Sequence, residues 1–129
     1  MIKKAKRVKS IMDVRSTLTK GTIPIMLLEI LRSGEMYGYE IVKEITRRSG
    51  GELEFGQGTV YPLLYKLEEK GYLTSERKPT PGGKERRYYS ITDKGIKHLE
   101  TCKKTWEETS AAIGRVLGTQ PAGAGIVTA

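Results

Sequence analysis

Hydrophobic residues recur with the period of an amphipathic helix in four stretches of the chain. In the first, Ile23–Arg32, apolar positions fall at i, i+3 and i+4, and a Ser-Gly pair follows as a stop signal. The same period predicts a second helix over about Tyr37–Ser49, a third over about Thr59–Lys70, and a long last helix over about Asp93–Leu117. Two glycines follow the second predicted helix and one follows the third, and glycine is the residue that most often ends a helix.

Two shorter stretches alternate apolar and polar residues as strands do. They are Leu73–Lys78 and Glu85–Ile91, and the segment Pro79–Gly83 between them holds two prolines and two glycines, which favour a turn. Three helices, a hairpin and a long last helix are the layout of a winged helix-turn-helix with a C-terminal extension. The predicted fold class is therefore mainly α with a small β-hairpin (α+β).

The charge of the chain indicates an anionic partner. The 129 residues carry a formal net charge of +8 and a sequence pI of about 9.6, which favours nucleic acid as the partner. Residues 1–20 hold seven lysines and arginines against one aspartate. This basic arm has two readings, a solvated tail or a segment that touches phosphates.

The third predicted helix has a polar face that suits the major groove. We expect Thr59 to cap it and Pro62 to lie within its first turn. With the aliphatic residues turned inward, the opposite face carries Tyr61, Tyr65 and Lys66, whose side chains can meet base edges or phosphates. The alternative is that the two tyrosines are half-buried aromatics without a role in binding.

The predicted hairpin is cationic and follows this helix directly. A basic ribbon with a Pro/Gly tip can follow the DNA backbone or enter a minor groove, although a solvated loop is the alternative. Helix and hairpin together supply the predicted DNA contacts: Gln57, Thr59, Tyr61, Pro62, Tyr65, Lys66, Lys84, Arg86 and Arg87.

The last predicted helix carries a heptad pattern. Leu99, Trp106 and Ile113 are seven residues apart, and Cys102 and Val116 lie at companion positions. Such a stripe predicts a homodimer seam through these five residues. The alternative is that the helix packs onto its own domain.

Trp106 has two readings within this stripe. It is either a packing residue or a flat surface on which a planar aromatic effector stacks.

The pattern gives the chain four segments. Residues 1–21 form the basic N-terminal arm, residues 22–91 the winged helix-turn-helix DNA-binding domain, residues 92–117 the C-terminal dimerisation helix, and residues 118–129 a flexible tail.

Catalytic, metal and membrane roles are not favoured. His98 and Cys102 are the only residues of their kinds, no nucleophile–base set stands out, and no metal or cofactor motif is present. There is no apolar run long enough to span a membrane and no signal-peptide pattern, so we expect the cytoplasm.

Several motifs resemble those of the PadR family of phenolic-acid-response transcriptional regulators. The resemblance covers about residues 20–117, and its pieces are Gly38–Ile41, Gly58–Leu64, Leu67–Leu73 and Gly82–Gly95. It implies a winged-helix homodimer that binds a two-fold operator, usually as a repressor, and that dimerises through the last helix. It also implies that a tryptophan at the place of Trp106 can stack on flat aromatic ligands at the dimer centre. The basic arm and the tail after Leu117 depart from the family's usual shape.

Two function classes follow. The first is a sequence-specific DNA-binding repressor, a homodimer on double-stranded DNA relieved by a small planar ligand. The second is a winged-helix module that binds proteins and leaves nucleic acid alone. The second predicts a neutral helix face and wing, whereas Lys66, Lys84 and Arg86 are cationic.

Overall fold

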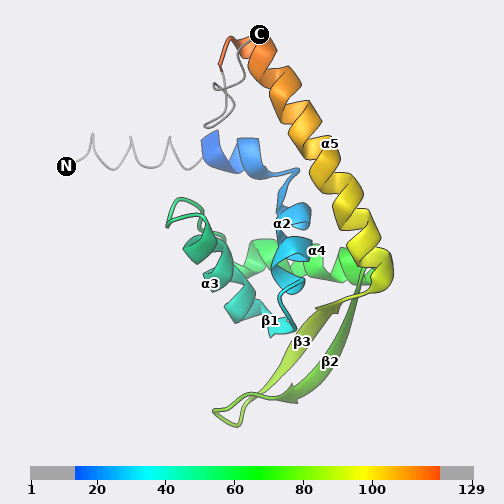
Figure 1. The fold of residues 1–129 in the computed structure, drawn as a ribbon. Coiled ribbons are helices and arrows are strands. Elements are labelled where there is room, and N and C mark those ends of the chain that lie inside the picture. Colours follow the sequence, from blue (N-terminus) through cyan, green and yellow to red (C-terminus); the bar gives the residue numbers. More distant parts are fainter. Residues whose placement is uncertain (1–13, 120–129) are drawn as a thin grey trace, which may run out of the picture.

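The computed structural model describes residues 14–119 (Figure 1). After a short helical segment at residues 14–19, the elements in chain order are α2 (Ile23–Leu31), β1 (Met36–Tyr37), α3 (Gly38–Arg48), α4 (Gln57–Glu69), β2 (Leu73–Pro79), β3 (Glu85–Ile91) and α5 (Asp93–Leu117). The predicted fold class, mainly α with a small sheet and a long last helix, is confirmed. Most of the predicted basic arm and of the predicted tail lies outside the described residues.

The core forms where α2, α3 and α4 meet. Helix α2 is apolar on most of its surface and buries Leu27, Leu28 and Leu31 almost completely. Helix α3 contributes Ile41 and α4 contributes Leu64, both without exposed area. Their spacing places them on one face of each helix, so the three helices close over a single cluster.

The hairpin pairs with a third, two-residue strand that the sequence pattern did not predict. The sheet order is β1-β3-β2, all antiparallel, and Tyr37 on β1 lies opposite Tyr88 on β3. Two residues are too few to show an alternating pattern. The consequence is that the start of α3 is tied to the base of the wing (Figure 1).

Helix α4 begins two residues earlier than predicted. Its N-cap is Gly56, whose carbonyl accepts from the backbone N–H groups of Thr59 and Val60. The prediction that Thr59 caps the helix is therefore wrong, and so is the prediction that Pro62 lies in the first turn. Pro62 sits inside the helix, where it removes one backbone hydrogen bond.

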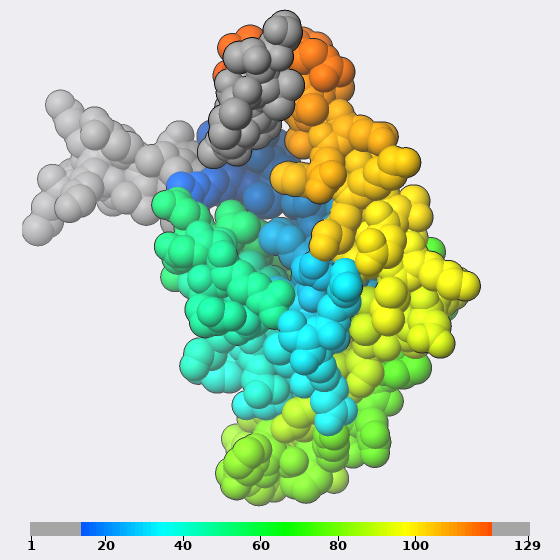
Figure 2. All heavy atoms as spheres, in the orientation of Figure 1, coloured from blue at the N-terminus to red at the C-terminus, as the bar shows by residue number. Residues whose placement is uncertain are grey.

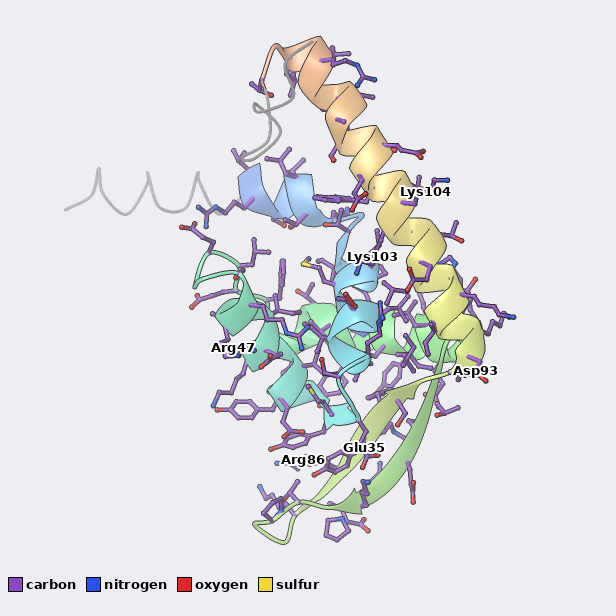
Figure 3. The ribbon with its side chains drawn as sticks, in the orientation of Figure 1. Glu35, Arg47, Arg86, Asp93, Lys103 and Lys104 are labelled. Atoms are coloured by element: carbon purple, nitrogen blue, oxygen red, sulfur yellow. The ribbon has the colours of Figure 1, made fainter. Side chains whose placement is uncertain are left out.

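Helix α5 has the predicted bounds and two different halves. Its first half is rooted in the domain, where Leu99 is buried and Gly95 lies against the carbonyl of Tyr72 too closely to admit a Cβ atom. Two ion pairs to α2 brace it, Arg32–Glu100 at 3.1 Å and Lys103–Glu29 at 2.6 Å, and Figure 3 labels Lys103 between the two helices. The second half, orange in Figure 2, extends beyond the body of the domain.

None of the helices within residues 14–119 is long and apolar enough to cross a membrane.

Candidate nucleic-acid interface

The first turns of α4 present an exposed polar face beside the sheet. Gln57, Thr59 and Pro62 are exposed, and so are Tyr65 and Lys66 one turn further on. Each was predicted as a DNA contact, and the structure brings all five to the surface of one helix. An α-helix fits into the major groove of DNA, so this surface can face base edges.

Tyr61, the remaining predicted contact on α4, is half-buried. A Cβ atom at Gly38 would lie only 2.5 Å from its ring, so the side chain fills the gap between α3 and α4. A larger residue at position 38 would force the Tyr61 ring to shift. Tyr61 therefore packs between two helices, and its ring also lines the groove described next, so its role in DNA binding stays a prediction.

A groove of about 620 Å³ separates the start of α4 from the tip of the wing. Its walls come from β1, α3, α4 and the hairpin, and its lining residues are Tyr37, Tyr39, Gln57, Tyr61, Thr80, Gly82, Lys84 and Arg86. Four of the predicted DNA contacts thus line one opening: Gln57, Tyr61, Lys84 and Arg86. The charged groups in that lining are cationic, which suits a polyanion.

Arg86 and Arg87 were predicted to act alike, but they lie on opposite faces of β3. Arg86 is exposed and lines the groove, and Figure 3 labels it on the wing. Arg87 is half-buried and donates to Ser75 Oγ at 3.0 Å, and Ser75 in turn donates to Glu68 of α4 at 2.7 Å. Since successive residues of a strand alternate in direction, only Arg86 faces the groove.

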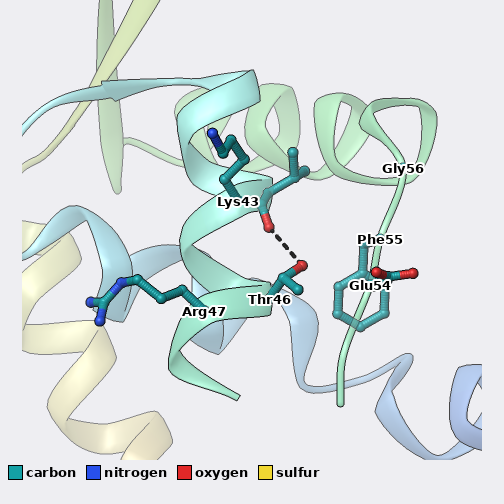
Figure 4. Close-up of a pocket in the computed structure, with 7 residues that line it drawn as sticks. Lys43, Thr46, Arg47, Glu54, Phe55 and Gly56 are labelled. Atoms are coloured by element: carbon teal, nitrogen blue, oxygen red, sulfur yellow. Dashed lines mark hydrogen bonds between the residues drawn. The ribbon is translucent and has the colours of Figure 1, made fainter. Parts of the chain in front are cut away.

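A shallow hollow beside α3 adjoins the entry to α4 (Figure 4). Phe55 lies across from Thr46, while Lys43 and Arg47 are on α3 and Gly56 precedes α4. One carboxylate, that of Glu54, also lines it.

The two arginines at the end of α3 share one carboxylate partner. Glu44 accepts hydrogen bonds from both Arg47 and Arg48. These bonds lower the pKa of Glu44 to about 2, so the carboxylate is ionised at all ordinary pH values.

Sequence reasoning missed the contribution of α3 and β1 to this surface. Tyr39 lines the groove and Lys43 borders the hollow, and both are exposed. Their i, i+4 spacing on the outward face of α3 is a signal that could have been read.

On α5 the structure separates the predicted seam residues. Leu99 is 0% exposed and belongs to the domain's own core, so its assignment to a dimer seam is wrong. Trp106, Ile113 and Val116 are 50%, 53% and 87% exposed, and Cys102 is half-buried. The stripe is therefore an open apolar surface only from about Cys102 onward.

The Cys102 thiol is not set up as a nucleophile. Its Sγ lies 3.3 Å from His98 Nε2, whose ring stacks on Tyr72 with centroids 4.1 Å apart. Burial raises the pKa of Cys102, which keeps the thiol protonated. Within residues 14–119, no group of three or more His, Cys, Asp or Glu side chains is placed to hold a metal ion.

Comparisons with known proteins agree on one class. The family model described as "Transcriptional regulator PadR-like family" matches residues 27–101. The "Negative transcriptional regulator PadR" of Bacillus subtilis is 34% identical over 74 residues, a region that covers 57% of this chain and 40% of that protein. A crystal structure of a PadR family transcriptional regulator from Eggerthella lenta superposes with a TM-score of 0.73 at 29% identity, covering 93% of this chain and 100% of that one. A transcriptional regulator from Clostridium thermocellum gives a TM-score of 0.70 at 31% identity, with coverages of 78% and 94%.

Proposed function

This chain belongs to the PadR-like family of transcriptional regulators, and from that premise we propose that it is a sequence-specific DNA-binding repressor. The family is one of regulators rather than enzymes, and it implies binding to DNA. The observation that carries the proposal is the groove in which Gln57 of α4 meets Lys84 and Arg86 of the wing. A polar helix face and two cations around one opening fit the edge of a major groove and the phosphates that flank it.

The proposal divides the work between α4 and the wing. Tyr65 is exposed beyond the first turn of α4 and can reach base edges, whereas Tyr61 is held between two helices. Arg86 and Lys84 are long, flexible cations without an ion pair within residues 14–119, which suits contact with phosphate. We therefore expect α4 to set the sequence and the wing to supply affinity.

A homodimer is the second part of the proposal. The exposed residues Trp106, Ile113 and Val116 lie along the half of α5 that extends beyond the domain, and half-buried Cys102 begins the stripe. A second copy of the same helix covers such a stripe by two-fold symmetry, and the two domains then face a two-fold operator. The Bacillus subtilis relative is a negative transcriptional regulator, which favours repression as the direction of control here.

Relief of repression by a small planar ligand is the third part. Half of the Trp106 surface is open, so its indole is free to stack on a flat aromatic molecule in a dimer. Binding there would change the spacing of the two α4 helices and so couple to DNA affinity.

Selection of duplex DNA by the purified protein tests the function directly. We expect enrichment of a two-fold motif, and a steep fall in affinity for it as salt rises. Recovery of no motif, together with salt-independent binding, would refute the proposal and favour the protein-interaction module instead.

A further inference from the structure

A line of stacked side chains runs from α3 across β1 to the wing. The ring of Tyr39 stacks on that of Tyr37 with centroids 6.5 Å apart, and Tyr37 meets Tyr88 edge to face at 5.3 Å. A lysine closes each end: Lys43 Nζ lies 5.2 Å from the centre of the Tyr39 ring, and Lys78 Nζ lies 4.9 Å from that of Tyr88. We call these five residues the ladder. Contacts of both kinds are attractive, so each member limits the freedom of the next.

The lysines at the two ends of the ladder differ in whether they form an ion pair. Lys78 forms an ion pair with Glu35, so its charge is compensated within the chain. Lys43 has no ion pair within residues 14–119, because the carboxylates nearest to it in sequence are used elsewhere. Glu40 accepts from the backbone N–H of Tyr37, and Glu44 holds the two arginines that follow. Within residues 14–119, Lys43 is therefore the one cation of α3 that forms no ion pair.

The open end of the ladder adjoins the proposed DNA surface. Tyr39 lines the same groove as Gln57 and Arg86, and Lys43 lines the same hollow as Gly56, the residue before α4. Figure 4 labels Lys43 on α3 and Gly56 in the neighbouring segment that leads into α4. The pair thus lies along the edge of the surface from which α4 begins.

We propose that Tyr39 and Lys43 form a phosphate clamp for the DNA backbone, outside the helix and wing contacts described above. The proposal rests on the proposed function. Both side chains are donors, a phenol hydroxyl and an ammonium group, and a phosphate oxygen accepts from both. The ladder holds the Tyr39 ring, so less side-chain freedom is given up when the clamp closes on its ligand.

The structure supplies matched controls for Lys43. Arg47 lies one turn further along the same helix and lines the same hollow, and its replacement removes the same charge, but its guanidinium already forms an ion pair with Glu44. Lys104 is exposed on α5, on the far side of the domain from α3 in Figure 3. Comparing Lys43→Gln with Arg47→Gln and Lys104→Gln therefore separates a phosphate contact from a change of net charge.

The measurement is the binding of each full-length variant to a mixed-sequence duplex over a series of salt concentrations. When a bound chain neutralises one phosphate fewer, the slope of log K against log salt becomes less steep by about 0.9. We expect that change for Lys43→Gln and a smaller one for both controls. Equal slopes in all three variants would overturn the clamp, whereas a wild-type protein without salt-dependent binding would overturn the proposed function instead.

Tyr39→Phe tests the other half of the clamp without disturbing the ladder. The ring remains, so the thermal midpoint should stay at the wild-type value, while affinity for the mixed-sequence duplex falls several-fold because one hydrogen bond to a charged group is removed. Unchanged affinity would overturn the role of this hydroxyl. Tyr39→Ala, which removes the ring as well, should also lower the midpoint.

Discussion

Truncation of Ile113 is the sharpest test of the proposed dimer. Its side chain is 53% exposed on the projecting half of α5. Full burial of an isoleucine side chain contributes about 1.5–3 kcal/mol, so covering the exposed half contributes about 1 kcal/mol in each chain. In a symmetric dimer the loss counts twice, and Ile113→Ala should weaken dimerisation by about 2 kcal/mol, or about 30-fold in the dissociation constant.

Sedimentation velocity over a dilution series measures this change, with circular dichroism to show that the helix content is kept. Ile96→Ala is the matched control, because Ile96 lies on the same helix and is 37% exposed but stands outside the heptad stripe. The dimer dissociation constant of Ile96→Ala should stay within about twofold of the wild-type value, since substitutions of exposed residues usually change the free energy by less than about 0.5 kcal/mol. If both variants dimerise with the same constant, the stripe is not the interface and the reasoning from exposure fails.

Three further predictions concern the DNA surface, the effector and the core. Tyr65→Ala should cost about 1–3 kcal/mol of binding free energy on the selected operator and relax the sequence preference at one base position, while Arg86→Ala should weaken binding to all sequences alike. Arg77→Ala, on the opposite face of the wing, should do neither, and identical effects of Tyr65→Ala and Arg86→Ala would contradict the separate roles of α4 and the wing. Flat aromatic cations and phenolic acids should quench the fluorescence of Trp106, and Trp106→Ala should abolish their effect on DNA affinity; an indole that no such molecule quenches is only a dimer-core residue. Gly38→Ala should destabilise the fold by about 1–3 kcal/mol in thermal or urea unfolding, because the added methyl group meets an aromatic ring of α4, and an unchanged midpoint would contradict that contact.

The elements that the sequence predicted well are those with long, regular patterns. The bounds of α5 and of β3 agree with the pattern, and those of α2 and α3 differ by one residue at one or both ends. Helix α4 was harder to place, because its N-cap is a glycine with no side chain to mark the start. Strand β1 had no pattern to read, since it exists only through its pairing with β3.

The candidate site was predictable in its residue types but not in its directions. A run of two arginines does not tell which one faces the groove; the register of the hairpin decides this for Arg86 and Arg87. A heptad pattern likewise gives the spacing of apolar residues but not the partner that buries them. Leu99 and Ile113 share the pattern, yet Leu99 is buried in the core and Ile113 is exposed. Tyr39 was missed for the same reason, because its place in the groove depends on the approach of the wing.

Two ion pairs fix the first half of α5 to α2, so any tilt of the projecting second half takes place about a point in the core. From Leu99 to Leu117 the helix rises about 27 Å. A rotation of only about 10° at the pivot would move the far end by about 5 Å, which is one helical turn's worth of rise. In a dimer joined at that end, the tilt would change the distance between the two α4 helices. That distance must match major grooves about 34 Å apart. In such a dimer the Arg32–Glu100 and Lys103–Glu29 pairs would limit this tilt, and with it the operator spacings that the dimer could match.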